Sequence, residues 1–323
     1  MKKTAMLIAV TLGFGAALTG LGWAQEGYPA KPVRLISPFP PGGSVDLIAR
    51  MVAATLTEAV GQQVIVENRS GASGNIGTEA AMRAPADGYT LLVHTIPFVA
   101  NAFLYSKLPY DPLNDFVPVM LVSSSPSLLA VHPSMPVRSV KELIALAKSR
   151  PGQLNYGTAG PATNPHIAGE LLNLLGKVDI VAVHFKGGGP ALIATISGEI
   201  DITFTNFSET SAFVKAGRLR ALGVSSAKRV PSMPDVPAIT EILQGFEFTT
   251  WQGLFAPRDT PRPVTALLND RLRKALTAPD QVRRFQDRGL DVIASTPDEF
   301  AAHLRSEYQK WGRVIKERGM KAE

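Results

Sequence analysis

Cysteine is absent from this sequence of 323 residues. Its absence excludes disulfide bonds, a thiol nucleophile and zinc sites built from thiolates. Histidine is scarce, and its five positions (94, 132, 166, 184 and 303) include no His-x-x-x-His or His-Glu-x-x-His pair of a metalloenzyme. The segment Ser225-Ser226-Ala227-Lys228 matches Ser-x-x-Lys but lacks the Ser-Asp-Asn and Lys-Thr-Gly companions of penicillin-interacting enzymes. We therefore expect no catalysis, no metal and no cofactor, with a hydrolase as the minor alternative.

Apolar runs long enough to cross a membrane are absent beyond the N-terminus. There, the basic MKKT precedes the uncharged AMLIAVTLGFGAALTGLGWA. This pattern predicts a secretory signal peptide over residues 1–24, cleaved after Ala24, where small residues suit the peptidase. A retained anchor is the rival interpretation because the run is about 17–20 residues long. The glycines, the basic start and the polar QEGYPAKP that follows favour cleavage, so we expect an exported, soluble protein.

Charge is moderate, since 19% of the residues are charged. Cleavage of the leader would remove Lys2 and Lys3 and leave 31 basic against 27 acidic residues, a formal net charge of +4. The basic residues gather near the C-terminus in RLRKAL and QVRRFQDR, on segments of helical period. Solvated helix faces explain them better than nucleic-acid binding, so we expect no nucleic-acid partner.

Short strand-like runs alternate with longer amphipathic runs, which is typical of α/β folds with parallel strands. We expect strands at 33–39, 63–69, 88–95, 179–185 and 201–206 and helices at 44–61 and 165–175. Ser44 is the expected N-cap of the first helix, and Gly61 is placed to end it. The C-terminal helix opens with a capping box of Thr296 and Glu299, with Pro297 as its first residue.

Two β-rich stretches, 119–136 and 246–261, each end in a proline-marked loop. We interpret both as crossings between two lobes. Lobe 1 is then discontinuous, made of residues 25–124 and 251–323, and lobe 2 is residues 125–250. This arrangement encloses a cleft between two α/β lobes.

Glycines lie between strand and helix in PFPPGGS (38–44) and in HFKGGGPA (184–191). A loop that opens a helix presents unpaired N–H groups and about half a positive charge from the dipole, which favours an anion. Tight turns are the alternative interpretation. Neither loop has the Lys-Ser/Thr ending of a P-loop, and no Gly-x-Gly-x-x-Gly follows the first strand. The two loops predict a carboxylate site in the cleft.

Four blocks of the chain resemble the Bug family, the periplasmic receptors of tripartite tricarboxylate transporters. They are YPAKPVRLISPFPPGGSVDLIAR, VIVENRSGASGNIGTEAAMRAPADGYTLLVHT, NYGTAGPATNPHIAGELL and VHFKGGGPALIATISGEIDITFTN. The resemblance implies a two-lobed, type II periplasmic-binding-protein fold that binds a small carboxylated solute without catalysis. It also implies that both glycine loops hold one ligand carboxylate through N–H groups and water, which here would involve Pro41, Gly42, Gly43, Ser44, Lys186, Gly187 and Gly188.

The implied partners are a dicarboxylate, tricarboxylate, amino acid or aromatic acid, and the membrane permease of such a transporter. A sensor kinase that receives the ligand state is the alternative partner, and we expect a monomer. The apolar Ile96-Pro97-Phe98 slightly favours an apolar or aromatic acid.

Five further residues are candidates for ligand contacts. Thr158 and Asn206 lie at predicted strand ends, where α/β clefts collect ligand groups. Asn164 and His166 lie at a predicted helix start, where His166 could equally serve as a hydrogen-bonding residue of that helix start. Phe39 either packs over the ligand or fills the core.

Overall fold

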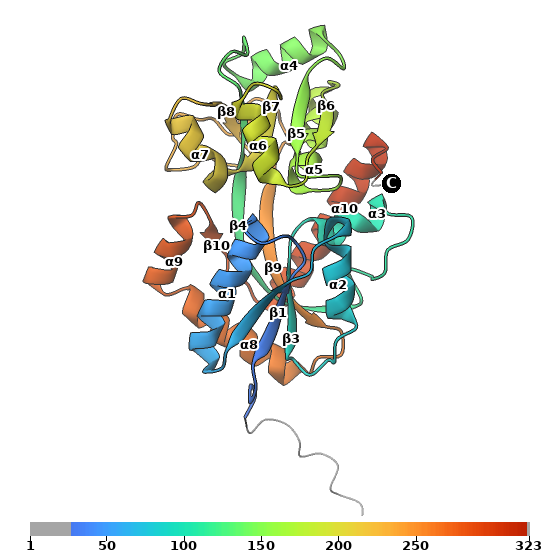
Figure 1. The fold of residues 1–323 in the computed structure, drawn as a ribbon, viewed down its shortest axis with the longest axis vertical. Helices are drawn as coiled ribbons and strands as arrows, with labels where there is room; N and C mark the ends of the chain where they lie inside the picture. The colour runs from blue at the N-terminus through green and yellow to red at the C-terminus, as the bar shows by residue number, and fades with distance from the viewer. Residues whose placement is uncertain (1–26, 322–323) are drawn as a thin grey trace, which may run out of the picture.

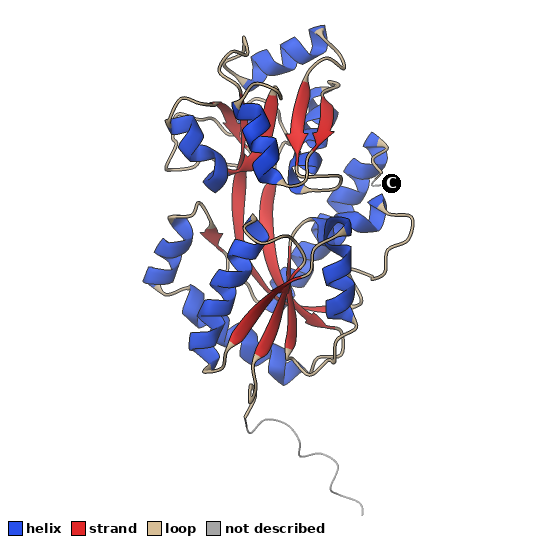
Figure 2. Cartoon of the chain, viewed as in Figure 1, coloured by secondary structure: helices blue, strands red, loops and turns tan. Residues whose placement is uncertain are grey.

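The computed structural model describes residues 27–321, so the predicted signal peptide lies outside the described residues. The chain forms two α/β halves joined by two long strands, β4 and β9 (Figure 1). In each half the strands lie inside and the helices cover them (Figure 2). The described residues include no helix that is long and apolar enough to cross a membrane.

The lower half in Figure 1 is built from the first and last parts of the described chain, and the final helix rises from it toward the upper half. Its strands are β1 (Val33–Ser37), β2 (Val64–Asn68), β3 (Thr90–His94) and β10 (Asp291–Val292). Its helices are α1 (Ser44–Val60), η1 (Ala72–Gly74), α2 (Asn75–Met82), α3 (Pro97–Leu104), α8 (Arg262–Leu276), α9 (Pro279–Gln286) and α10 (Pro297–Arg318). Strand β1 pairs in parallel with both β2 and β3, as the alternating pattern predicts.

The upper half is built from the middle of the chain. Its strands are β5 (Asn155–Thr158), β6 (Val181–His184), β7 (Ile202–Asn206) and β8 (Arg220–Val224). Its helices are α4 (Val140–Ser149), α5 (Asn164–Gly176), α6 (Gly188–Ile196), α7 (Phe207–Lys215) and the short η2 (Ile239–Glu241). Strand β5 pairs in parallel with β6 and β7, so helices α5 and α6 follow the carboxyl ends of parallel strands.

Strands β4 (Phe116–Val131) and β9 (Thr249–Pro257) cross from one half to the other. They pair with each other antiparallel, from Phe116 opposite Pro257 to Pro126 opposite Thr249. Beyond Pro126, β4 pairs with β7 and β8 of the upper half. The two β-rich stretches expected as crossings are therefore these two strands, whereas the lobe boundaries at 124/125 and 250/251 stay a prediction.

Helix α1 has the apolar face that its sequence predicts. Val45, Ile48, Val52 and Leu56 are buried in a core shared with α8 and the lower sheet. Each such side chain stabilises the fold by about 1.5–3 kcal/mol relative to an exposed one. Gly61 ends the helix with φ +71°, as predicted. The expected N-cap is wrong by one residue: Gly43 is the N-cap, and Ser44 is the first helical residue.

Helix α10 joins the two halves on one flank. Its predicted capping box is confirmed, with the Thr296 side chain accepting from the Glu299 N–H. Trp311 is fully buried and donates to Glu307, which also accepts from Trp251 of β9. These side chains anchor the C-terminal helix on the crossing strand.

Candidate functional site

The loop between β1 and α1 presents its backbone to the space between the two halves. Gly42 has φ +84°, a conformation that favours glycine, and its N–H donates to Asp46 Oδ2 at 3.0 Å. That N–H group is therefore taken by the chain itself. Leu47 is the first residue of α1 whose N–H reaches an intrahelical carbonyl, that of Gly43. The N–H groups of Ser44 and Val45 precede it and have no intrahelical acceptor.

Asp46 holds this loop in shape. Its carboxylate accepts from Arg50 at 2.9 Å and from Asn68 Nδ2 at 2.8 Å, besides the Gly42 N–H. Burial pushes the pKa of Asp46 up, but the hydrogen bonds from Arg50, Gly42 and Asn68 outweigh it and hold this pKa below its usual value. The carboxylate thus stays charged and fixes the start of α1.

A cavity of about 110 Å³ lies between the start of α1 and the upper half. One wall comes from α1 and its loop, and the opposite wall comes from the junction of β7 and α7. The lining residues are Gly42, Gly43, Ser44, Leu47, Ile48, Ser125, Asn206, Ser208, Glu209 and Leu290. Four sequence-predicted residues therefore meet at one cavity: Gly42, Gly43 and Ser44 from one lobe, and Asn206, which lies more than 160 positions further along the chain.

The second glycine loop approaches the same cavity from the upper half. Gly187 has φ +121° and is the N-cap of α6, which begins at Gly188. A Cβ atom built on Gly188 would lie 3.7 Å from Glu209 Oε2. The start of α6 thus borders a residue that lines the cavity. Lys186 is exposed and is not among the lining residues.

A polar cluster also joins the two halves, although none of its residues lines the cavity. Asn164, at the start of α5, donates to Thr95 at 3.5 Å and to Thr250 at 3.4 Å. Its Oδ1 is buried without a partner among the described residues, as is Nε2 of His94. Burial lowers the pKa of His94 to about 3, so this ring is neutral. Phe39 packs edge-on against His94, with ring centroids 5.5 Å apart.

Thr158 and His166 form a separate group in the upper half. Thr158 is fully buried, and its hydroxyl pairs with Nδ1 of His184 at 2.6 Å. His166 Nδ1 accepts from the Ala162 N–H at 3.0 Å, and burial lowers the pKa of His166 to about 4. This contact fits the helix-start interpretation of His166. Neither residue lines the cavity, nor does Pro41.

Sequence reasoning missed several groups at the site. Ser125, Ser208 and Glu209 line the cavity, and His94 is a buried neighbour of Phe39. The sequence carries a weak signal for Ser208, which lies two residues after Asn206 at a strand end, and none for Glu209. Ile96 and Phe98, whose apolar character slightly favours an apolar or aromatic acid, are fully buried in the core and so give no support to that ligand class.

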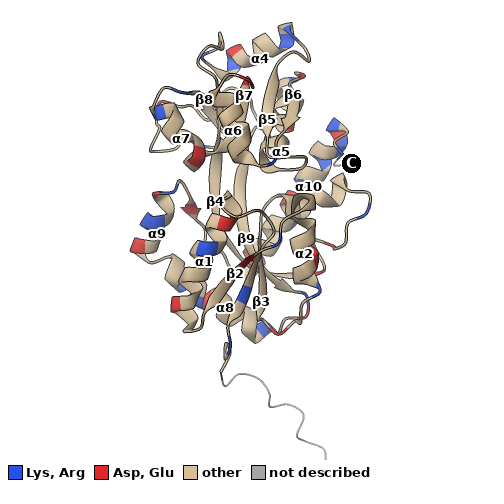
Figure 3. Cartoon of the chain, in the orientation of Figure 1, with Lys and Arg blue, Asp and Glu red and all other residues tan. Residues whose placement is uncertain are grey.

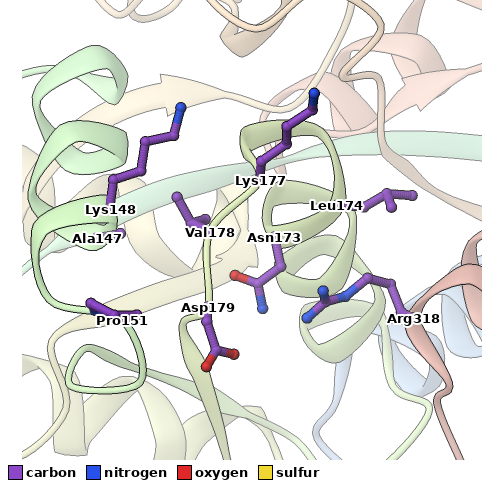
Figure 4. A pocket seen from close by; sticks show the side chains of 9 residues that line it. All are labelled: Ala147, Lys148, Pro151, Asn173, Leu174, Lys177, Val178, Asp179 and Arg318. Atoms are coloured by element: carbon purple, nitrogen blue, oxygen red, sulfur yellow. The ribbon is translucent and has the colours of Figure 1, made fainter.

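A larger hollow, of about 470 Å³, lies between α4, α5 and the end of α10 (Figure 4). Its charged groups already have other roles or point apart. Arg318 pairs with Glu170 at 2.8 Å, and the ends of Lys148 and Lys177 point away from Asp179 in Figure 4. No glycine loop opens into it. The cavity between the halves is therefore the better candidate for ligand binding.

Residues 48–320 match the family described as "Tripartite tricarboxylate transporter family receptor". The chain belongs to this receptor family. Among its relatives, Protein BugT of Bordetella pertussis is 34% identical over 324 residues, which cover 99% of both chains.

Two solved structures extend this relationship. Rpa4515 of R. palustris, solved with adipate, is 34% identical with a TM-score of 0.85, covering 91% of this chain and 99% of that chain. MatC of Rhodopseudomonas palustris, solved with bound malate, is 34% identical with a TM-score of 0.81, covering 89% of this chain and 99% of that chain.

These similarities confirm the expected Bug-family membership and the two-lobed periplasmic-binding-protein fold. The two halves described above are thus the lobes of a solute-binding receptor. Among residues 27–321 there is no group of three or more His, Asp or Glu that could hold a metal ion.

Proposed function

We propose that this chain is a periplasmic receptor that binds one small carboxylate-bearing solute in the cavity between its lobes and delivers it to the membrane permease of a tripartite tricarboxylate-type transporter. The observation that carries the proposal is the cavity itself. The start of α1 lines it from one lobe, and Asn206 and Ser208 line it from the other. The relatives solved with adipate and malate support a carboxylate as the ligand class.

The binding chemistry follows from the helix ends. The N–H groups of Ser44 and Val45 lack intrahelical acceptors, and the dipole of α1 adds positive charge at the same place. The N–H groups at Gly188 and Gly189 are equivalent donors at the start of α6. A carboxylate that accepts from both helix ends would link the lobes. We propose that this link stabilises the closed form, with lobe 1 as 25–124 and 251–323 and lobe 2 as 125–250.

The chain binds and releases its solute unchanged in this proposal. The groups at the cavity are amides, hydroxyls, apolar side chains and one carboxylate, Glu209. They provide hydrogen bonds and shape, and Glu209 has no histidine or second acid beside it in the cavity lining with which to share general acid–base work. We also propose a monomer, exported with residues 1–24 as a cleavable leader.

Native mass spectrometry of protein purified from the periplasm tests this function. We expect a mature chain that begins at Gln25 and carries one small acid of unaltered mass. Titration with the acid that mass spectrometry identifies, repeated with a chelator present, should show metal-independent binding of a carboxylate. A chemically altered ligand, a binding loss on chelation, or a retained leader on a membrane-bound chain would each contradict the corresponding part of the proposal.

A further inference from the structure

Glu209 is the single charged side chain among the described residues that line the interlobe cavity. It lies in the first turn of α7, on the wall opposite the start of α1. Its Oε2 atom borders the start of α6, 3.7 Å from the position of a Cβ on Gly188. In Figure 3 the acidic part of α7 lies at the end of that helix nearer to α1. A negative group thus lies beside two helix ends that attract anions.

No cation of the described chain neutralises this carboxylate. Among the described residues, its one side-chain hydrogen bond is a long one, from Asn206 Nδ2 at 3.5 Å. None of the ion pairs among residues 27–321 includes Glu209. Arg50, on the neighbouring helix α1, is engaged by Asp46. Burial raises the pKa of Glu209, because its charged form lacks a compensating partner here.

We propose that Glu209 determines specificity by pairing with a positively charged nitrogen of the solute, so that the ligand is a zwitterion with a carboxylate and an ammonium group. This inference rests on the proposed carboxylate-receptor function. The carboxylate of the solute lies against the starts of α1 and α6, and its ammonium group lies against Glu209. A solute with two carboxylates would instead place negative charge beside Glu209 with no cation to offset it.

The first-turn position of Glu209 has a purely structural interpretation as well. An acid there stabilises the dipole of α7. That role requires negative charge near the helix start but gives no reason for the side chain to line a cavity formed by both lobes. A structural role predicts a change in thermal stability for Glu209→Gln and no change in the choice between ligands.

Calorimetric titration of the full mature chain with three matched pairs separates these roles. The pairs are 4-aminobutanoate with succinate, 6-aminohexanoate with adipate, and L-alanine with L-lactate. Both members of each pair have the same number of carbon atoms. The terminal aminomethyl group of the first two amino acids is a carboxylate in succinate and adipate, and the ammonium group of L-alanine is a hydroxyl in L-lactate. In the wild type we expect the ammonium member of the best-binding pair to bind more tightly. Glu209→Gln should weaken that member by roughly 10- to 100-fold, the range of a partly to fully desolvated charge pair.

Glu199→Gln is the matched control, because Glu199 is exposed in the same lobe and does not line the cavity. It should leave the preference unchanged. The inference is overturned if the wild type binds succinate, adipate or L-lactate as tightly as the matched ammonium compound, or if Glu209→Gln keeps the preference. The proposed function survives both of these results. Absence of binding by all six compounds, together with no co-purified acid, would overturn the receptor function and the inference together. The comparison of ligand affinities in the wild type tests the inference even if Glu209→Gln does not fold.

Discussion

Replacing Gly43 by valine is the most direct test of the helix-end site. Gly43 has φ −80° and ψ 171°, an extended conformation that valine adopts without strain. A Cβ atom there would meet only the Pro40 carbonyl oxygen, at 3.6 Å, an ordinary contact. The new methyl groups would enter the cavity that Gly43 lines. The substitution therefore removes space for the anion while leaving the loop intact.

The expected loss of affinity follows from the hydrogen bonds that the methyl groups would block. Hydrogen bonds to a charged group are worth about 1.5–3 kcal/mol each. Losing one or two of those from Ser44 and Val45 should weaken carboxylate binding about ten- to a thousandfold, at 1.4 kcal/mol per factor of ten. Gly188→Val should act similarly from the other lobe, because its Cβ would lie in ordinary contact with Glu209.

Calorimetry with the acid identified by mass spectrometry measures this effect. The free energy of unfolding without ligand should stay within about 1 kcal/mol of the wild-type value, as for other strain-free glycine replacements. Gly176→Val is the matched control, because Gly176 ends α5, does not line the cavity, and its Cβ would make only ordinary contacts, the shortest at 3.5 Å. If Gly43→Val and Gly188→Val both fold and bind with wild-type affinity, the carboxylate does not rest on these helix ends.

Three further predictions follow from the same site. Lys186→Ala should weaken carboxylate binding about tenfold or less in the same titration, because the side chain is exposed and backbone amides supply most of the binding energy. A loss larger than that of Gly43→Val would mean that the lysine holds the carboxylate. Small-angle scattering should show a smaller radius of gyration at saturating ligand, since such receptors close by a hinge, and an unchanged radius would place the site elsewhere. Asp46→Asn should lower the free energy of unfolding by about 1–3 kcal/mol at pH 7. The folded-state pKa of Asp46 is depressed, so its contribution is present above the unfolded pKa of about 3.9 and is lost as pH falls through the folded value. Urea unfolding should therefore show the variant and wild type converging in acid; a constant difference would contradict this account.

The elements of lobe 1 that follow local patterns were predictable. The apolar spacing from Val45 to Leu56 predicts the buried face of α1, and Gly61 predicts its end because the left-handed C-cap has φ +71°. The N-cap was shifted by one residue because glycine and serine both suit that position and only the backbone geometry separates them. The presence of β4 and β9 likewise follows from their β-rich composition, but their bounds differ by three to five residues from the expected 119–136 and 246–261.

The composition of the cavity was only partly predictable. Gly42, Gly43, Ser44 and Asn206 each lie at a junction of strand and helix, which is a local signal. Glu209 carries no such signal, since its importance depends on α1 and α6, which the chain brings beside it only in the folded state. His94 ends strand β3, and its Nε2 is buried because Phe39, Phe98 and Gly74 pack around the ring. Contacts between distant segments decide these roles.

The two crossing strands determine the direction in which a solute can enter. Because β4 and β9 bond to each other up to Pro126 and Thr249, they resist independent twisting and we expect them to bend together. On one flank, α10 ties the lobes through the Arg318–Glu170 pair, while the cavity lies toward α7 and α9 on the other flank (Figure 1). We therefore expect the lobes to separate on the α7 and α9 side while the α10 side stays in contact. The solute would then enter and leave between α7 and α9.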